Sequence, residues 1–382
     1  MGPLKFNRWR DGFNPLRQLT LPRLLSLLEA GDRGEWTDPQ WLFRFMEMTD
    51  ATLSAIITRR TSALLSLDWE IRTISAADPA LAEEQAIALR LAYDRLDNLR
   101  EALRFLALAT FRGYAHLELH RDAAGDIRRM EPVEQWFWVR DGMFAPWEYC
   151  PDSRSGVRHG IPIDPEEFII RETIPLHRLL ALLYYKKNIS MKDWDSFVEL
   201  YGIPSLFLVG PPNTPAEKEE EYLEIAKEVI GNGRGYLPNG ADIKFATPPA
   251  GSGPFSAHIN YLDQQMVLAA TGGQLTMLTQ AGSGTLAGGA HADTFRKIAQ
   301  QEAAEIAEVF QRQFDRPLLN RLFPGQPIAA YFEFDQTDPA TISTLMTHVQ
   351  YAAALGFKTD VQQIAEKTGL KLEPLEIQAE NP

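Results

Sequence analysis

The stretch that most constrains the fold of this chain is LTQAGSGTLAGGAHADTF at residues 278–295. It lies between two segments with the apolar spacing of long helices. It contains Gly282, Gly284, Gly288 and Gly289. Each glycine lowers helix propensity by about 1 kcal/mol relative to alanine. We therefore expect the helix to break, with residues 278–290 forming a mobile loop or a kinked connection. The alternative is a buried turn whose glycines allow close packing of two helices.

Glycine-rich loops often hold phosphates or nucleophiles, but this one lacks the residues for either role. A Walker-type loop needs lysine directly after its last glycine, and the first lysine here is Lys297. The dinucleotide fingerprint follows a strand, whereas this stretch follows a helical segment. A hydrolase turn has glycines two residues before and two residues after its serine, whereas Ser283 has Ala281 and Thr285 there and Ser252 has Ala250 and Pro254. His291 with Asp293 lacks the second histidine of a zincin motif. We expect no enzymatic activity, cofactor or metal.

The charge balance argues against tight nucleic-acid binding. The chain has 38 Lys and Arg against 51 Asp and Glu, a formal net charge of -13. Phosphate contacts dominate affinity for nucleic acid, so a strong binder normally carries the opposite excess. The balance remains compatible with a protein that lets nucleic acid slide past.

The cysteine content and the hydropathy of the chain argue against several kinds of site and segment. Cys150 is the only cysteine, which excludes an intrachain disulfide and cysteine-based zinc or iron–sulfur sites. Pro22 and Arg23 interrupt the apolar run near the N-terminus, which argues against a signal peptide. No stretch approaches the roughly 18 apolar residues of a membrane span, so we expect a soluble protein.

Apolar spacing predicts an α+β chain. Residues 1–35 are expected to be loosely ordered, and a helix follows from Asp38, with Asp38 as its N-cap and Pro39 at its first position. DWEIRTI alternates as a strand, and two helices are expected over 79–112, the second ending near Gly113. Short runs separated by Ala-Gly-Asp and Asp-Gly predict hairpins. A further helix is expected to run from about Ala290 to Pro317, and AAYFEF to form a strand.

Two local clusters allow a functional or a structural interpretation. QWFWV at residues 135–139 reads as a strand with Trp136 and Trp138 on one face, which suits either base stacking or burial on both faces. The scarcity of nearby cations favours burial. EKEEEYLE at residues 217–224 is either a solvated helix face or an acidic docking surface.

Taken in order, several segments resemble portal proteins of tailed bacteriophages, most closely those of Mu-like phages and prophages. They span roughly residues 14 to 325 and include NPLRQLTLPRLLSLLEAGDRG, LFRFMEMTDATLSAIITRRTSALLSLDWEI, RMEPVEQWFWVRDG, DWDSFVELYGIPSLFLVG and GGQLTMLTQAGSGTLAGGAHADTFRKI. The resemblance rests on their joint order, because none of them alone is as specific as a metal signature.

The resemblance implies an elongated subunit that assembles into a ring, in most portals a dodecamer, at one capsid vertex. Double-stranded DNA passes through such a ring without sequence specificity during packaging and ejection. The implied partners are further copies of the chain, the terminase large subunit, and capsid and head-completion or tail proteins. The implied location is the virion, with assembly in the host cytoplasm. The implied regions are an N-terminal arm (1–37), a wing (38–174), a stem helix (175–202), a clip (203–248), a second stem helix (249–277), a tunnel loop (278–290), a wing return helix and strand (291–335) and a short helical crown (336–382).

The resemblance also assigns roles to two sets of residues. The channel set is expected to contact passing DNA weakly and consists of Thr279, Gln280, Gly282, Ser283, Gly284, Thr285, Gly288 and Gly289. The clip set lies on a charged helix expected over 215–231, where terminase would dock, and consists of Glu217, Glu220, Glu221, Glu224 and Glu228. The competing classes are a non-portal capsid or tail adaptor and a nucleotide-using enzyme with an atypical loop.

Overall fold

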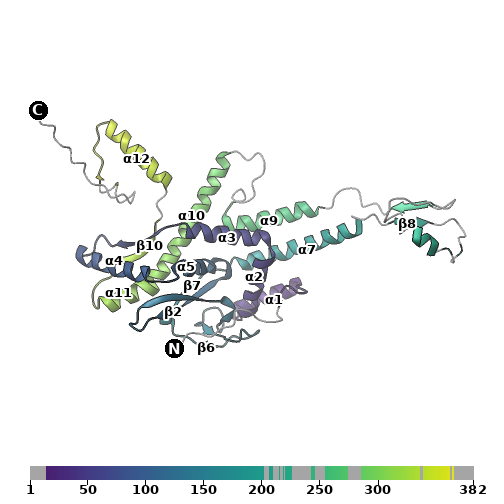
Figure 1. Ribbon diagram of the computed structural model, residues 1–382, viewed down its shortest axis with the longest axis horizontal. Helices are drawn as coiled ribbons and strands as arrows, with labels where there is room; N and C mark the ends of the chain where they lie inside the picture. The colour runs from purple at the N-terminus through teal and green to yellow at the C-terminus, as the bar shows by residue number, and fades with distance from the viewer. Residues whose placement is uncertain are drawn as a thin grey trace.

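The protein has a broad body, a long two-helix stem and a small pair of strands at the far end of the stem (Figure 1). This computed structural model describes residues 14–201, 206–209, 215, 218, 220–225, 242–245, 254–273, 285–335, 339–361 and 364. The mixture of helices and strands in one elongated subunit confirms the α+β class.

Three helices begin the described chain: α1 (Leu21–Asp32), α2 (Thr37–Thr49) and α3 (Ala51–Leu65). The expectation of loose order was wrong for residues 21–32, because Thr20 caps α1 and its apolar face is buried. Asp38 is not an N-cap: α2 starts at Thr37, and the Asp38 carboxylate accepts a bond of 2.9 Å from Ser155 Oγ. Asp50 separates α2 from α3 and accepts a bond from the Leu53 backbone at 2.9 Å.

The next elements form one end of the body. Strands β1 (Trp69–Thr73) and β10 (Ala330–Phe334) confirm the two strands predicted at DWEIRTI and AAYFEF, and the structure pairs them antiparallel. Helices α4 (Pro79–Asp94), α5 (Leu99–Ala107) and α6 (Ala109–Arg112) follow β1. Gly113 ends α6 with a φ of 97°, a left-handed conformation that glycine adopts without steric cost. The predicted helix end near this residue is confirmed.

A three-stranded antiparallel sheet, in the order β3-β2-β7, lies beside these helices. It consists of β2 (Tyr114–Arg121), β3 (Ile127–Val133) and β7 (Phe168–Glu172). A second small sheet consists of β4 (Trp138–Val139), β5 (Glu148–Tyr149) and β6 (Ile161–Pro162). QWFWV is only partly a strand, because residues 135–137 form a 3₁₀ turn that leads into β4. Trp136, Phe137 and Trp138 are all buried, so burial is the correct interpretation.

The stem consists of α7 (His177–Tyr201) and α9 (Phe255–Thr271), which run side by side away from the body (Figure 1). Beyond their far ends, β8 (Leu206–Val209) pairs antiparallel with β9 (Asp242–Phe245). A helix therefore lies in each range assigned to the stem, and β8 and β9 lie in the range assigned to the clip. The assignment of these ranges to the regions of a portal subunit stays a prediction. The sequence also predicts a turn between two strands at Asn239 and Gly240, which lie outside the described residues.

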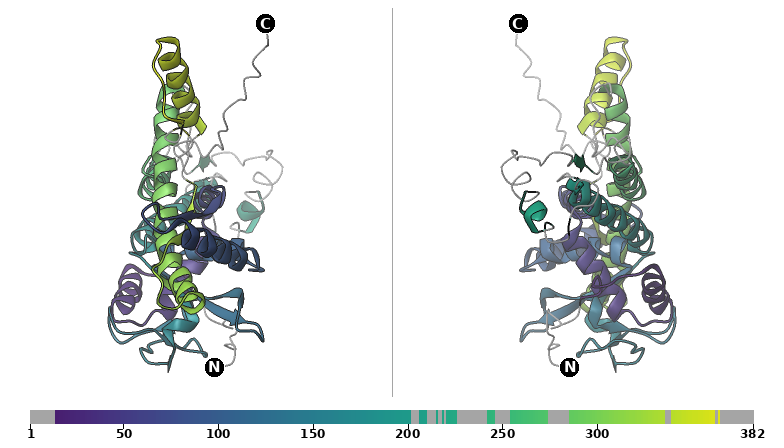
Figure 2. Two further views of the ribbon diagram at one scale, coloured as in Figure 1. Left: turned by 90° about the vertical axis from the view of Figure 1, so that its left-hand side faces the viewer. Right: turned by 90° about the vertical axis from the view of Figure 1, so that its right-hand side faces the viewer.

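The chain then returns along the body through α10 (Thr285–Phe310), a π-helical turn (Gln311–Asp315) and α11 (Arg316–Leu322). The predicted end at Pro317 was wrong, because Pro317 lies in the first turn of α11, where a missing N–H costs no helical bond. Helix α12 (Pro339–Ala354) follows, and Gly356, two residues after its end, has a φ of 84°. Figure 2 shows α10 running along the body and α12 lying beyond it.

Three large apolar clusters and a smaller one between α4, α11 and β10 fill the described part of the body. One packs α5 and the β3-β2-β7 sheet against α10 and β10. A second joins α1, α2 and α3 to the near ends of α7 and α9, so the stem grows out of this core. The third is aromatic and includes Trp41 stacked on Trp136 at 4.3 Å between ring centroids.

Candidate functional site: the stem and its root

The two stem helices are joined by polar and aromatic contacts along their length. Lys187 Nζ lies 2.7 Å from Asp263 Oδ1, and Ser190 Oγ lies 2.8 Å from His258 Nδ1. The rings of Phe197 and Phe255 meet farther out, with centroids 5.8 Å apart. These contacts make the stem a paired unit.

Two cations attach the stem to the helices of the body. Lys187 is buried and also lies 2.8 Å from Asp50, the residue that separates α2 from α3. Arg60 on α3 donates to the Ala270 carbonyl at 2.8 Å, near the C-terminal end of α9. The same guanidinium donates to Glu302 on α10 at 2.9 Å. Helix α3 therefore binds both stem helices and α10.

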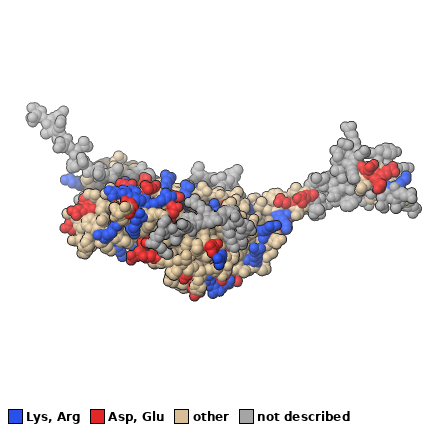
Figure 3. Space-filling view, turned by 60° about the horizontal axis from the view of Figure 1, so that its bottom comes forward, with Lys and Arg blue, Asp and Glu red and all other residues tan. Residues whose placement is uncertain are grey.

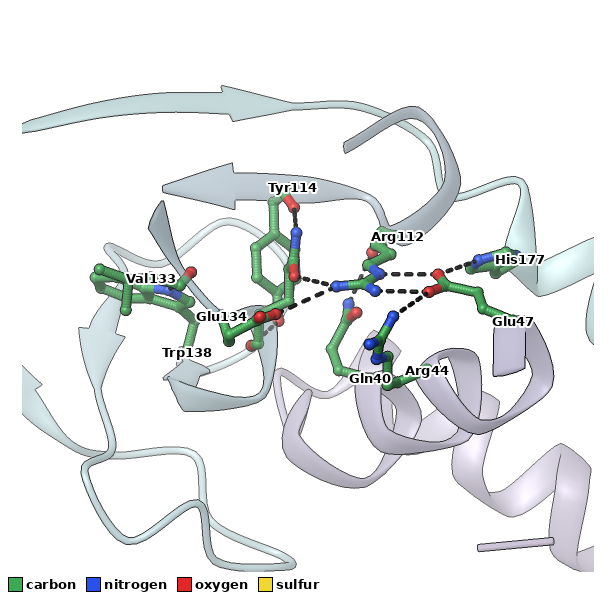
Figure 4. Close-up of polar contacts among 10 residues, drawn as sticks. Gln40, Arg44, Glu47, Arg112, Tyr114, Val133, Glu134, Trp138 and His177 are labelled. Atoms are coloured by element: carbon green, nitrogen blue, oxygen red, sulfur yellow. Dashed lines mark hydrogen bonds and ion pairs between the residues drawn. The ribbon is translucent and has the colours of Figure 1, made fainter. Parts of the chain in front are cut away.

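The root of α7 contains a buried ionic network, shown in Figure 4. Arg112 Nε and Nη2 donate to the two oxygens of Glu47 at 2.9 and 2.6 Å, a bidentate pair. His177 Nε2, in the first residue of α7, lies 2.9 Å from Glu47 Oε1. Arg112 Nη1 also donates to Gln135 Oε1 at 2.6 Å. Through these four side chains the network joins α2, α6, the 3₁₀ turn and the start of the stem.

Electrostatics keep Glu47 and Arg112 ionised. Burial alone would raise the pKa of the Glu47 carboxyl, but the adjacent Arg112 guanidinium and the His177 bond hold that pKa well below its usual 4.5. Burial lowers the pKa of His177, and Glu47 only partly offsets this effect. An ionised carboxylate can only accept, so the neutral His177 ring carries its proton on Nε2. Its Nδ1 has no partner among the described residues.

One face of α7 changes its surroundings along the helix. Six residues follow the alternating four- and three-residue spacing of a helix-packing seam: Leu180, Tyr184, Lys187, Met191, Trp194 and Val198. The first three are buried against the body and α9. The last three are 44%, 39% and 52% exposed, because the body ends before they are reached. We call these last three residues the distal stripe.

A family model described as the portal protein of Mu bacteriophage matches residues 40–370. The chain belongs to the Mu portal protein family. This membership confirms the resemblance inferred from the order of the sequence segments.

Two curated relatives support the assignment. The portal protein of Escherichia phage Mu is 26% identical over 386 aligned residues, covering 93% of this chain and 71% of the relative. The Mu-like prophage FluMu protein gp29 of Haemophilus influenzae is 24% identical over 372 residues, with the same coverage.

Solved structures with much lower identity share the fold of this family member. A chain from the virion of a native gene transfer agent particle has a TM-score of 0.62 at 13% identity, covering 92% of this chain and 99% of its own. A chain from the neck of a native gene transfer agent particle, computed with C12 symmetry, has a TM-score of 0.59 at 13% identity, covering 91% and 98%. The elongated body-and-stem architecture is therefore shared by proteins with little sequence in common.

The clip set is described in part. Residues 220–225 are helical, and Glu220, Glu221 and Glu224 are exposed on this turn. Glu217 and Glu228 lie outside the described residues. The structure thus brings three of the five glutamates together on one solvent-facing segment, and their role in docking stays a prediction.

The channel set divides at the start of α10. Thr279, Gln280, Gly282, Ser283 and Gly284 lie outside the described residues. Thr285, Gly288 and Gly289 lie in the first turns of α10, so the predicted break does not extend to residue 290. Two glycines cost about 2 kcal/mol of helix propensity, which α10 tolerates because alanines surround them and the helix continues for 26 residues. Contact with DNA stays a prediction.

The described residues offer neither a metal site nor a membrane-spanning helix. Within the described ranges, no group of three or more His, Cys, Asp and Glu side chains is arranged to hold a metal ion. His291 and Asp293 lie on α10, where the side chains are not described. Among the helices that the structure describes, none is long and apolar enough to span a membrane.

Proposed function

We propose that this chain forms the ring at a capsid vertex through which double-stranded DNA is packaged and ejected. The observation that carries the proposal is the distal stripe on α7. Its spacing continues the buried face of the stem, yet in one copy of the chain Met191, Trp194 and Val198 remain 39% to 52% exposed. A neighbouring copy would cover this face.

Ring assembly explains why such a stripe is present on a single subunit. Rotational symmetry makes each contact heterologous, so one face of a copy meets a different face of the next. Fully burying a large apolar side chain contributes about 1.5–3 kcal/mol. The contribution is repeated at every interface of the ring, which favours closed assemblies. Family membership and the fold shared with the gene transfer agent chains support a ring, for which we propose twelve copies.

The charge distribution supports passage of DNA and docking of a partner. In Figure 3 acidic side chains gather where the stem meets the distal segments. Asp193, Asp195 and Glu199 are exposed there on α7, and Glu220, Glu221 and Glu224 are exposed beyond it. Acidic surfaces repel the DNA backbone, so DNA would slide without being held. The exposed glutamates near the tip are available to terminase, where charge mainly sets encounter rate and specificity.

The remaining elements complete the proposed assembly. The body would form the wing, and α12 with the residues after it would form a short crown. Head-completion or tail proteins would bind the assembled ring after packaging. The energy for packaging would come from terminase, because we propose no catalytic activity for this chain.

Electron microscopy of the purified protein tests the proposal directly. We expect closed rings with a central hole wide enough for a DNA duplex. Mass photometry over a range of concentrations would give the number of copies. Monomers alone at every concentration, both free and with capsid protein present, would contradict the proposal, as would a closed particle without a hole.

A further inference from the structure

A cavity of about 520 Å³ opens beside the root of the stem. We call it the socket. Its apolar lining consists of Trp36, Tyr114, Met143, Phe144, Ile174 and Pro175. Ile174 and Pro175 lie in the segment that leads from β7 into α7, directly before His177. The socket and the Glu47 network therefore border the same short connection into the stem.

The wall that carries Phe144 is held in place by backbone bonds. Arg140 N donates to the Gly34 carbonyl at 3.2 Å, and Gly142 N donates to the Arg33 carbonyl at 3.1 Å. Gly34 has a φ of 92°, and a Cβ there would lie 1.8 Å from the Arg140 carbonyl oxygen. Only glycine allows this close approach. The loop over residues 140–144 is therefore tied to the turn between α1 and α2.

The rim of the socket exposes large apolar side chains to water. Phe144 is 91% exposed and Ile174 is 88% exposed, the two highest values for large apolar residues in the described part of the chain. Leu179, in the first turns of α7, is 49% exposed. Apolar surface of this kind beside a cavity is typical of a protein-binding site.

The polar groups of the socket favour a protein segment as its occupant. Arg140 is paired with Glu172 at 3.1 Å, and Arg178 is paired with Asp32. With both cations paired, the site has no free charge to select DNA. Trp36 Nε1 and Arg140 Nε are buried donors with no partner among the described residues.

We propose that the socket binds an apolar side chain from a neighbouring copy in the ring. The inference deepens the proposed function and rests on it. The second copy is favoured because the exposed rim leads through Ile174 into α7, the helix whose distal stripe also lacks a cover. A neighbouring copy that contacts both ends of α7 would bury the rim at its start and the distal stripe farther out, on either side of the residues that the chain's own body covers. The socket would set the angle between adjacent subunits, since it receives one side chain at the pivot of the stem.

Matched substitutions test the socket separately from the ring. Phe144→Ser and Ile174→Ser change side chains that water surrounds in one copy, so each should leave monomer folding unchanged. Each should raise the concentration at half-assembly about tenfold or more, in line with the loss of one large buried side chain. Ile87→Ser, on α4 and 59% exposed, is the control and should assemble as the unchanged protein does. Circular dichroism confirms folding, and mass photometry measures assembly.

A photo-crosslinking amino acid at position 144 identifies the occupant. In rings formed by the otherwise unchanged chain, we expect crosslinks between two copies, absent from the monomer fraction. If rings form but the crosslinks join residue 144 to its own chain, to a different protein in assembled particles, or to nothing, the socket proposal is overturned and the proposed ring stands. If no ring forms under any condition, both proposals fail.

Discussion

The same helix-packing seam runs along the near and distal halves of α7, but it is buried in the near half and exposed to water in the distal half. In the near half, Lys187 is buried between Asp50 and Asp263, and His177 is buried against Glu47. In the distal half, Met191, Trp194 and Val198 follow the same spacing and face water. The near half is covered by the chain itself, whereas we propose that a neighbouring copy covers the distal half. Under this proposal the buried seam of the near half serves folding, and the distal stripe serves assembly.

Removing the Glu47 carboxylate should have the largest effect on folding. Glu47→Ala leaves the Arg112 guanidinium buried without its bidentate partner, and breaking such a pair costs about 3–5 kcal/mol. Urea denaturation measures the free energy of unfolding. The control is Glu101→Ala, whose exposed pair with Arg129 should contribute about 1 kcal/mol or less. Equal losses from the two substitutions would contradict the assignment of a closed near half.

Asp315 is also a buried carboxyl group, but its partners are neutral, whereas Glu47 is paired with the charged Arg112. Tyr93 Oη and Phe332 N donate to it at 2.6 and 2.7 Å, and burial raises its pKa from 3.8 to about 6. The protonated form is favoured in the fold, so this contribution to stability is present below pH 3.8 and is lost as pH rises through 6. At 1.36 kcal/mol per unit the loss is about 3 kcal/mol at most.

Asp315→Asn should remove that pH dependence while keeping both hydrogen bonds, because an amide can accept from Phe332 N and donate to Tyr93 Oη. We expect the difference in unfolding free energy between the variant and the unchanged chain to grow in favour of the variant from pH 4 to pH 7. Urea midpoints across this range provide the measurement. A difference that stays constant with pH would show that Asp315 is ionised throughout.

The contribution of Glu47 to stability depends on pH in the opposite direction from that of Asp315. Its pKa in the fold lies below 4.5, so its contribution is present above pH 4.5 and is lost as pH falls from there.

A charge on the distal stripe should affect assembly and spare folding. Val198→Asp places a carboxylate where a neighbouring copy would exclude water, so we expect at least a tenfold rise in the concentration at half-assembly. The monomer should unfold at an unchanged urea concentration, because Val198 is 52% exposed. Ile87→Asp, on α4, is the control. If Val198→Asp assembles normally, another surface forms the ring contact.

The smallest effect on stability is expected at the tip. Reversal of Glu220, Glu221 and Glu224 to lysine changes exposed side chains, so neither folding nor ring formation should change. Packaging of DNA in a terminase-driven reaction should fall, because charge sets the encounter with the partner. Loss of the ring instead would place this segment in a subunit contact.

Much of the fold followed from local sequence patterns. Apolar spacing predicted the helices on both sides of the glycine-rich stretch, and turn residues predicted the β2–β3 hairpin, because these features depend on residues close together in the chain. The start of α2 was missed, since Asp38 and Pro39 resemble a cap but bonds to a distant loop decide the boundary. Gly288 and Gly289 led to the wrong prediction that the helix break extends to residue 290. Helix propensity alone predicts helix ends poorly, because a long helix can include unfavourable residues.

The Glu47–Arg112–His177 network could not have been found by sequence reasoning. Glu47 stands 65 residues from Arg112 and 130 from His177, and each looks locally like an ordinary polar residue. Only the tertiary fold brings them together. The socket was missed for the same reason, because Phe144 and Ile174 belong to separate loops that no spacing rule connects.

Because α7 is long, the Glu47 network at its start affects the position of its far end. A helix of 25 residues spans roughly 37 Å at 1.5 Å per residue. Over that lever arm, a tilt of about 5° at His177 would displace the far end by roughly 3 Å, about the length of a hydrogen bond. The bidentate Arg112–Glu47 pair joins α6 to α2, and the bond from Glu47 to His177 holds the first residue of α7 to this pair. These contacts resist such tilting. In the proposed ring, the contacts that hold α7 to the body would therefore help to set how accurately the far ends of the copies meet around the axis.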